Sequence, residues 1–248
     1  VIRPRPSMDL TFVFPCLNEE KTLGGCIRAV RASLDAAGDS LKYEVVVADN
    51  GSTDRSAEIA VAEGARVVPV PRRGYGAALR GGIEAAEGRY VMFADADSTY
   101  LYEDALPLYR KAVETDADMA IASRITGTIE PGAMPPLHRW LGTPVLTWLI
   151  NVLFHGRLTD CNSGFRCIKK TAYAGWGIRS DGMEFASELL IKALKNKASS
   201  VEIPSGLRQG PPERVAHLRT WRDGMRHLLF ILSERPRLFE IVGLMLLG

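Results

Sequence analysis

Two acidic residues, Asp95 and Asp97, flank Ala96 directly after the apolar run of residues 90–94. Such a run is typical of a buried strand, so we expect both carboxylates at the end of that strand. Carboxylate oxygens are ligands that Mg²⁺ and Mn²⁺ prefer, and proteins commonly share these ions with the phosphates of a substrate. The triplet therefore predicts a divalent metal site that holds a diphosphate, with Asp97 also in a catalytic role. A solvated acidic turn is the alternative.

A second strand-end carboxylate, Asp49, follows the apolar run of residues 43–48. A carboxylate in this position can accept hydrogen bonds from a ribose or a base. The next residues, Asn50 and Gly51, suit a tight turn, and residues 52–54 suit a helix N-cap, on structural grounds alone. We therefore predict that Asp49 contacts a nucleoside and that the residues after it shape the turn.

A glycine-rich run begins at Gly74 and resembles part of a dinucleotide-binding loop. Leu79 occupies the third small position, however, so that fingerprint fails. The glycines instead favour a close approach of the backbone. The N-terminus of the following helix, together with Arg72 or Arg73, predicts a site for an anion. An exposed basic pair is the alternative.

A third group of polar residues surrounds the turn at Gly164, with Asp160 before it and Arg166 after it. This group is either ordinary turn chemistry or an acceptor site. In an acceptor site Asp160 would be the base, and Arg166 would be an anion binder or a structural ion-pair partner. Glu184 opens a later helix, where an acidic residue also complements the helix dipole. The sequence has no zinc-spaced His/Cys cluster and no G-x-S-x-G elbow.

Short β-branched runs alternate with helical patterns through the first half of the chain, as in a parallel sheet covered by helices. Later residues predict a strand at 165–168, a helix at 182–195 and a strand at 200–203. The predicted fold is therefore Rossmann-like α/β, in which ligands lie at the carboxyl ends of the strands. The first four predicted strands are residues 10–14, 43–48, 66–70 and 90–94.

The composition is that of an ordinary globular protein. The 248 residues are 46% hydrophobic and 24% charged, enough for one large α/β domain or two small ones. The formal net charge of +2 is too small to argue for a nucleic-acid partner. The four cysteines form no C-x-x-C pair, which favours a reducing, cytoplasmic setting.

Two later segments predict contact with a membrane. Residues 137–154 are unusually apolar, and residues 214–233 form an amphipathic pattern with arginines outside the apolar stripe. Such segments suit an anionic membrane face; helices packed on the catalytic domain are the alternative. The apolar stretch after Pro236 is shorter than the about 20 residues that span a bilayer, so it is either an amphipathic end or the start of a longer membrane region. We predict a catalytic domain over residues 1–210 and a membrane-proximal helical segment over residues 211–248.

The polar clusters together resemble family 2 inverting glycosyltransferases, and most closely the dolichol- or polyprenol-phosphate mannose and glucose synthases. The resemblance covers roughly residues 9–205 and implies a GT-A fold. It further implies that Asp95 and Asp97 bind the metal and diphosphate, and that Glu184 is a donor-side acid. The motifs that carry it are Phe-Pro-Cys-Leu-Asn-Glu-Glu at residues 14–20, Asp-Asn-Gly-Ser-Thr-Asp at 49–54, Gly-Tyr-Gly-Ala-Ala at 74–78, Asp-Ala-Asp at 95–97 and Asn-Ser-Gly-Phe-Arg at 162–166. The residues expected to line the nucleoside pocket are Pro15, Asn18, Glu19 and Asp49.

One motif departs from the synthases. They often carry Arg-Tyr-Gly-x-Ser-Lys after the last strand, whereas this chain has Gly-Leu-Arg-Gln-Gly-Pro-Pro-Glu-Arg at residues 206–214. The Ser-Lys pair is absent, but basic residues remain. We therefore expect Arg208, with Arg73 and Gly74, on the phosphates of the donor.

The predicted reaction transfers a hexose, with inversion, from a donor of the GDP-mannose or UDP-glucose type to polyprenyl or dolichyl phosphate. The predicted place is the cytoplasmic face of a membrane, with Mn²⁺ or Mg²⁺ as cofactor. A phosphate monoester has a second pKa of about 6 and needs no base. A soluble or lipid hydroxyl acceptor is the alternative and would need Asp160. A sugar nucleotidyltransferase should show a glycine-rich loop after the first strand, where this chain has Pro15-Cys-Leu-Asn.

Overall fold

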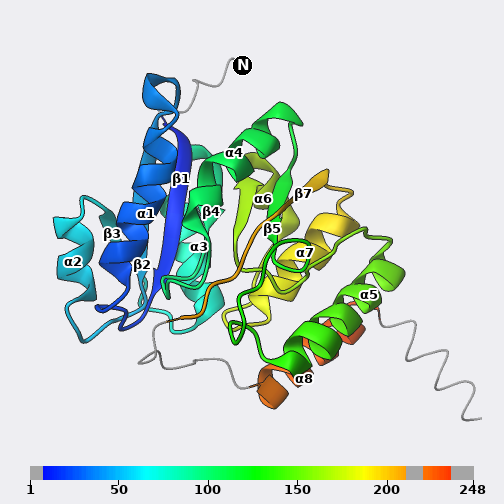
Figure 1. Cartoon of the computed structure of the whole chain (residues 1–248). Coiled ribbons are helices and arrows are strands. Elements are labelled where there is room, and N and C mark those ends of the chain that lie inside the picture. Colours follow the sequence, from blue (N-terminus) through cyan, green and yellow to red (C-terminus); the bar gives the residue numbers. More distant parts are fainter. Residues whose placement is uncertain (1–7, 211–219, 236–248) are drawn as a thin grey trace, which may run out of the picture.

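The computed structural model describes residues 8–210 and 220–235. Seven strands form one sheet in the order β3-β2-β1-β4-β6-β5-β7 (Figure 1). Only β6 runs antiparallel to its neighbours, β4 and β5. The strands are β1 (Met8–Cys16), β2 (Tyr43–Asp49), β3 (Arg66–Pro69), β4 (Gly88–Phe93), β5 (Met119–Ser123), β6 (Arg166–Lys169) and β7 (Ser200–Pro204).

Helices cover both faces of this sheet. Alternate residues of β1 point to opposite faces, so Phe12 and Phe14 pack with α1 and α4, whereas Val13 packs with α3 and α7. A π-helical turn, His138–Gly142, leads directly into α5. The helices are α1 (Leu23–Asp35), α2 (Ser56–Ala62), α3 (Tyr75–Ala85), α4 (Ala105–Glu114), α5 (Thr143–Phe154), α6 (Lys170–Trp176), α7 (Phe185–Lys195) and α8 (Thr220–Ser233).

The strand register brings the predicted polar clusters to one edge of the sheet. Cys16 at the end of β1 pairs with Asp49 at the end of β2, and Val13 of β1 pairs with Phe93 at the end of β4. Asp95 follows two residues after Phe93. The loops after β1, β2 and β4 therefore meet at the carboxyl edge, as the prediction of a Rossmann-like sheet requires.

The strands predicted from the first half of the sequence are confirmed as β1 to β4, and the later ones as β6 and β7. The predicted helix at 182–195 is confirmed as α7, which begins three residues later, at Phe185. The sequence pattern did not predict β5, α4 or α6. β5 has one β-branched residue, Ile121, between two alanines, which is a weak strand signal, although all five of its residues are buried.

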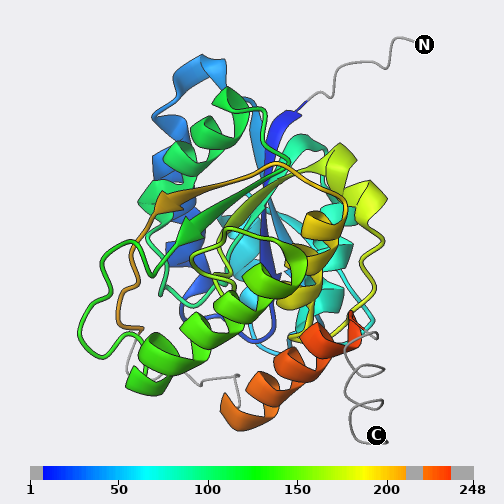
Figure 2. The same cartoon turned by 90° about the vertical axis from the view of Figure 1, so that its right-hand side faces the viewer.

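The described part of the predicted segment 211–248 is residues 220–235, which contain α8, and α8 packs against α7. Ile231 is fully buried, and the Ser187 hydroxyl on α7 lies 2.7 Å from His227 Nδ1. Figures 1 and 2 both show α8 beside α5, at the end of the molecule to which β1 runs. Among the described residues no helix is long and apolar enough to cross a membrane. Arg214 and Arg219, two arginines of the amphipathic pattern predicted over residues 214–233, lie outside the described residues.

Candidate functional site

The acidic loop after β4 is held in place by hydrogen bonds from its own residues. Asp97 is 6% exposed, and its Oδ1 accepts hydrogen bonds from the backbone N of Thr99 at 3.0 Å and from the Thr99 hydroxyl at 2.6 Å. The Tyr102 hydroxyl donates to the carbonyl oxygen of Asp95. Burial raises the pKa of Tyr102 well above its usual value, so this hydroxyl keeps its proton. These contacts therefore fix the carboxylate of Asp97 and the backbone of Asp95.

The turn at Gly164 packs directly against the acidic loop. The backbone N of Gly164 donates to the Tyr100 hydroxyl at 2.7 Å. A Cβ at this position would lie 2.9 Å from that hydroxyl oxygen and 3.2 Å from Asp95 Oδ2. Tyr75 also lies beside Asp95, and burial followed by the Asp95 charge raises the pKa of its hydroxyl. The absence of a side chain at Gly164 thus leaves space beside the Asp95 carboxylate.

The donor set of this loop fits a divalent metal. Asp95 and Asp97 supply hard carboxylate oxygens, which suit Mg²⁺ or Mn²⁺. Within residues 8–210 and 220–235 no group of three or more His, Cys, Asp or Glu side chains gathers as a metal site. Two carboxylates fit an ion that takes its other ligands from a diphosphate and water. The loop is therefore suited to a metal that is shared with substrate.

The predicted nucleoside residues Asn18 and Asp49 lie together after β1 and β2. Asp49 Oδ1 accepts a hydrogen bond from the backbone N of Ser52 at 3.0 Å. Asn18 Oδ1 accepts from the backbone N of Thr53 at 2.8 Å, and the Ser52 hydroxyl accepts from the backbone N of Asn18 at 3.0 Å. Asn18 has a φ of 59°, which is uncommon for a residue other than glycine. The two loops therefore fix each other.

Pro15 and Glu19 lie on the same side of the sheet. Pro15 pairs with Ala48 near the end of β1. The backbone N of Glu19 donates to the hydroxyl of Ser56, the first residue of α2, at 2.8 Å. The structure thus places all four residues predicted for the nucleoside pocket at the ends of β1 and β2. Their contact with a nucleoside stays a prediction.

Gly74 occupies a position that no other residue fits without strain. Its φ is 130°, and a Cβ would lie 2.1 Å from the carbonyl oxygen of Asp181. Its backbone N donates to Asn50 Oδ1 at 2.8 Å. Arg73 donates to the Asn50 carbonyl, and Arg72 pairs with Asp181. The two arginines therefore already have protein partners, and their predicted role on an anion stays a prediction.

Asp160 is fully buried in a bidentate ion pair with Arg124. Its Oδ2 accepts from Arg124 Nε at 2.7 Å and its Oδ1 from Arg124 Nη2 at 2.9 Å, while the backbone N of Asn162 donates at 3.1 Å. Burial alone would raise the pKa of Asp160, but Arg124 lowers it below the usual value. Because both oxygens are occupied and neither reaches solvent, this geometry favours a structural ion pair over a base.

The partner of that ion pair, Arg124, was not singled out in the sequence. A signal was present, because Arg124 directly follows the last residue of β5, the same kind of position that marked Asp49 and Asp95. From the sequence, Arg166 was considered as the ion-pair partner of Asp160. That residue is 1% exposed and donates instead to the carbonyl oxygens of Ala186 and Cys161, each at 2.9 Å. It therefore joins the turn at Gly164 to α7, which favours a structural role.

Glu184 precedes α7 as its N-cap residue. Its Oε2 is buried and has no hydrogen-bond partner among the described residues. A Cβ at Gly182 would lie 2.5 Å from this oxygen, so the backbone approaches it closely. A buried carboxylate oxygen with no partner has a high free-energy cost, which a ligand donor would offset. This supports the donor-side role predicted for Glu184.

Arg208 lies beside the acidic loop. Its guanidinium pairs with Glu103, and its backbone N donates to the carbonyl oxygen of Thr99 at 2.7 Å. The segment after β7 therefore reaches the residues that follow Asp97. This position fits the predicted contact between Arg208 and donor phosphates, which stays a prediction.

Comparison with known sequences gives a family for this chain. The model of glycosyl transferase family 2 matches residues 11–175. The low-salt glycan biosynthesis hexosyltransferase Agl6 of Haloferax volcanii is 41% identical over 228 residues, which are 92% of this chain and 54% of that protein. The chain thus spans about half the length of this relative. The dolichyl-phosphate hexose transferase of the same organism is 30% identical over 203 residues, 81% of this chain and 83% of that protein.

Comparison with solved structures supports the fold. The glucosyl-3-phosphoglycerate synthase of Mycobacterium tuberculosis, in complex with Mn²⁺, uridine diphosphate and glucosyl-3-phosphoglycerate, has a TM-score of 0.68 and 22% identity, covering 92% of this chain and 80% of that chain. The same synthase was also solved with Mg²⁺ and uridine diphosphate. The predictions of family and fold are confirmed: this chain belongs to glycosyltransferase family 2 and has a GT-A fold.

Proposed function

We propose that this chain transfers a hexose from a nucleotide sugar, of the GDP-mannose or UDP-glucose type, to polyprenyl or dolichyl phosphate with inversion. The observation that carries the proposal is the meeting of three carboxylates, Asp49, Asp95 and Asp97, at the carboxyl edge of the sheet, beside the buried Arg124–Asp160 pair. The similarity to a dolichyl-phosphate hexose transferase supports the acceptor.

On the donor side, Asp49 lies where it can accept a hydrogen bond from a ribose or base. Asp95 and Asp97 would hold Mg²⁺ or Mn²⁺, which when bound supplies positive charge to the leaving diphosphate. Arg208, next to the same loop, adds a cation near those phosphates. Thr99 and Tyr102 fix the acidic loop before any ligand arrives. This preorganisation reduces the free-energy cost of positioning the carboxylates during the reaction.

On the acceptor side, Arg124 is the residue we propose to bind the phosphate. Asp160 holds its Nε and Nη2, whereas its Nη1 donates to no partner within the described part of the chain. The Arg124 side chain is 12% exposed. Burial, and then the Arg124 charge, lowers the pKa of His138, which places these two side chains near each other. Arg124 thus has an N–H group left for a ligand, and it lies near His138 in the segment that leads into α5.

The proposed step is a single displacement. An oxygen of the acceptor phosphate forms a bond to the anomeric carbon as the bond from that carbon to the diphosphate oxygen breaks, and the electron pair leaves with the nucleoside diphosphate. Attack from the opposite face inverts the centre. The acceptor is already largely ionised at neutral pH, so no base is needed. This agrees with the geometry of Asp160, whose oxygens both bind Arg124.

The acceptor lipid implies that the chain works at a membrane surface, and α5 and α8 supply a face for it. Exposed apolar side chains follow one stripe of α5 at Val145, Trp148 and Val152, and α8 exposes Met225 and Leu229. The two helices lie side by side (Figure 2). Exposed tryptophans among aliphatic side chains are typical of proteins that bind the membrane interface. We propose peripheral binding through this α5–α8 face, at the cytoplasmic leaflet.

The transfer is tested with a panel of donors and acceptors. GDP-mannose, UDP-glucose and UDP-N-acetylglucosamine are each supplied with Mn²⁺ or Mg²⁺, and each is paired with a short polyprenyl phosphate, the matching polyprenol and soluble sugars. We expect turnover with one donor and the lipid phosphate. Turnover with the polyprenol or a soluble sugar, and none with the lipid phosphate, would refute the proposed acceptor.

Membrane binding is tested by flotation with liposomes. The double variant W148E/L229E is expected to lose binding, because charged side chains at the apolar face oppose its burial in the interface. Val61→Glu is the matched control, since Val61 is also an exposed apolar residue (65%) but lies on α2. Equal flotation of the double variant and the control would contradict the α5–α8 face.

A further inference from the structure

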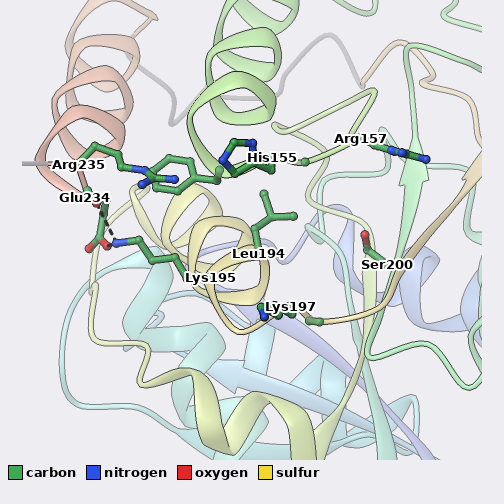
Figure 3. Close-up of a pocket in the computed structure, with 11 residues that line it drawn as sticks. His155, Arg157, Leu194, Lys195, Lys197, Ser200, Glu234 and Arg235 are labelled. Carbon is green, nitrogen blue, oxygen red and sulfur yellow. Dashed lines mark hydrogen bonds and ion pairs between the residues drawn. The ribbon is translucent and has the colours of Figure 1, made fainter. Parts of the chain in front are cut away.

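A cavity that the proposed reaction does not use lies where α5, α7 and α8 end and β7 begins (Figure 3). Its volume is about 790 Å³. Basic side chains dominate its charge, with a single acid, Glu234, among them. The charged and titratable residues that line it are His155, Arg157, Lys195, Lys197, Glu234 and Arg235.

Two of these cations already have structural partners. Lys195 pairs with Glu234, and its Nζ also donates to the Glu234 carbonyl oxygen at 2.9 Å. Arg235 donates to the carbonyl oxygen of Leu153 and lies 5.1 Å from the ring centre of Phe154. Cations at helix C-termini commonly complement the helix dipole in this way. These two residues therefore need no ligand to explain them.

The other basic residues of the cavity have no acidic partner within the described part of the chain. Within the described part of the chain, the side chains of His155, Arg157 and Lys197 make no ion pair or hydrogen bond. Glu234 does not compensate them, because its carboxylate pairs with Lys195 and lies 3.4 Å from Lys192. His155 is the C-cap residue of α5 and Lys197 follows the C-cap residue of α7, whereas Arg157 lies beyond the helix end. The cavity thus holds positive charge that no acidic side chain of the described structure balances.

The backbone that carries these residues is fixed. His155 and Lys197 have φ values of 56° and 55°, in the left-handed region. Asn151 closes the turn after α5, because its Oδ1 accepts from the backbone N of Leu158 at 2.9 Å and its Nδ2 donates to the Leu158 carbonyl at 2.8 Å. In Figure 3 His155, Lys197 and Ser200 surround Leu194, and Arg157 lies at the rim with its guanidinium directed outward. The backbone therefore holds these basic residues in defined positions before any ligand binds.

We propose that this cavity binds a phosphate group, with Lys197 supplying charge, His155 and Ser200 supplying hydrogen bonds, and the exposed Arg157 side chain turning inward from the rim to add a second charge. A phosphate carries the negative charge and the acceptor oxygens that such a set recognises. The site adjoins the apolar stripe of α5, because Val152 lies one turn before His155. The phosphate is carried by a phospholipid headgroup or by a soluble molecule, and the chemistry of recognition is the same for both. This proposal does not depend on the donor or the acceptor of the transfer reaction.

Two binding assays on the whole chain test the site and distinguish the two sources. In the first, inorganic phosphate and pyrophosphate are titrated by calorimetry. In the second, vesicles of phosphatidylcholine with and without phosphatidylglycerol are sedimented with the protein. We expect R157Q/K197Q to weaken one of these interactions about tenfold or more, because it removes two positive charges from the site. R110Q/K111Q is the matched control, since both residues are exposed on α4, and it should change binding by less than about twofold.

The conservative variant R157K/K197R keeps both charges and is expected to keep binding. A tenfold loss of phosphate or pyrophosphate binding in R157Q/K197Q supports a soluble ligand. A loss confined to the anionic vesicles supports a phospholipid headgroup. The proposal is overturned if R157Q/K197Q matches the wild type in both assays, or if R110Q/K111Q lowers binding as much. Melting temperatures of all variants show that they are folded.

Discussion

Replacing Asp160 with asparagine distinguishes the two roles considered for this residue. Asp160→Asn removes the charge that compensates Arg124 while it nearly keeps the shape of the side chain. Asp160 is fully buried and Arg124 is 12% exposed, so the guanidinium would stay in a site with little access to water. Removing one partner of a buried pair costs about 3–5 kcal/mol. For a domain of this size that corresponds to a fall in melting temperature of about 6–20 °C.

The assay is thermal unfolding at pH 7, beside turnover with a lipid phosphate and with a hydroxyl acceptor. Asp116→Asn is the matched control, because Asp116 also pairs with a cation, Lys169 at 2.9 Å, but its side chain is 72% exposed. We expect the control to melt close to the wild type. We expect Asp160→Asn to lose turnover with either acceptor through the displaced Arg124. If Asp160→Asn melts within about 2 °C of the wild type and loses turnover only with a hydroxyl acceptor, Asp160 is a base and our interpretation is refuted.

The pair also predicts a dependence of stability on pH. The pKa of Asp160 is lower in the folded chain than in the unfolded one. Its contribution to the free energy of unfolding is therefore fully present above the unfolded pKa of about 3.9 and is lost as the pH falls through the lower, folded pKa. The difference in melting temperature between wild type and Asp160→Asn should accordingly be constant near neutral pH and shrink below about pH 4.

Two further substitutions test the site. Asp97→Asn is expected to lower turnover about 100-fold or more at saturating Mn²⁺, because charge stabilisation by a bound metal contributes several kcal/mol. Initial rates of transfer measure this loss. Full turnover in the variant would exclude Asp97 as a metal ligand. Gly74→Ala would place a Cβ 2.1 Å from the carbonyl oxygen of Asp181 at a φ of 130°, so urea unfolding should show a loss of about 1–3 kcal/mol or more. Gly25→Ala, whose Cβ meets nothing within 4 Å inside α1, should stabilise the chain by about 0.5–1 kcal/mol. A stable Gly74→Ala would contradict the close approach.

The sequence predicted the parallel part of the fold because hydrophobic periodicity and strand-end polar residues are local signals. β1 to β4 each carry an apolar run of the expected length. β5 was not predicted, since its residues 119–123 include a single β-branched side chain, Ile121, between two alanines. The antiparallel direction of β6 was not predicted either. It depends on which strand it pairs with, and pairing between distant segments leaves no mark in a single sequence.

For the site, too, the sequence showed which residues follow a strand but not which distant residues pair with each other. Asp95, Asp97 and Asp49 were predicted because each follows its own strand. The partner of Asp160 could not be found in this way, since Arg124 lies 36 residues earlier. The polar motif around Gly164 pointed to Arg166, whose nearness in sequence made it the obvious partner. In the folded chain the loop geometry turns Arg166 toward α7, and only the packing of β5 beside β6 brings Arg124 to Asp160.

The loops of the site stabilise one another, and this bears on how any activity measurement is interpreted. Asn18 binds the backbone after β2, Asn50 binds the backbone N of Gly74, and Asp160 binds the backbone N of Arg124. Each of these polar side chains thus orders a loop other than its own. A substitution at any of them would move a neighbouring loop even if the residue never touches a ligand. Loss of turnover in one variant therefore identifies a ligand-binding residue only when the melting temperature is unchanged and the loop it holds is known to stay in place.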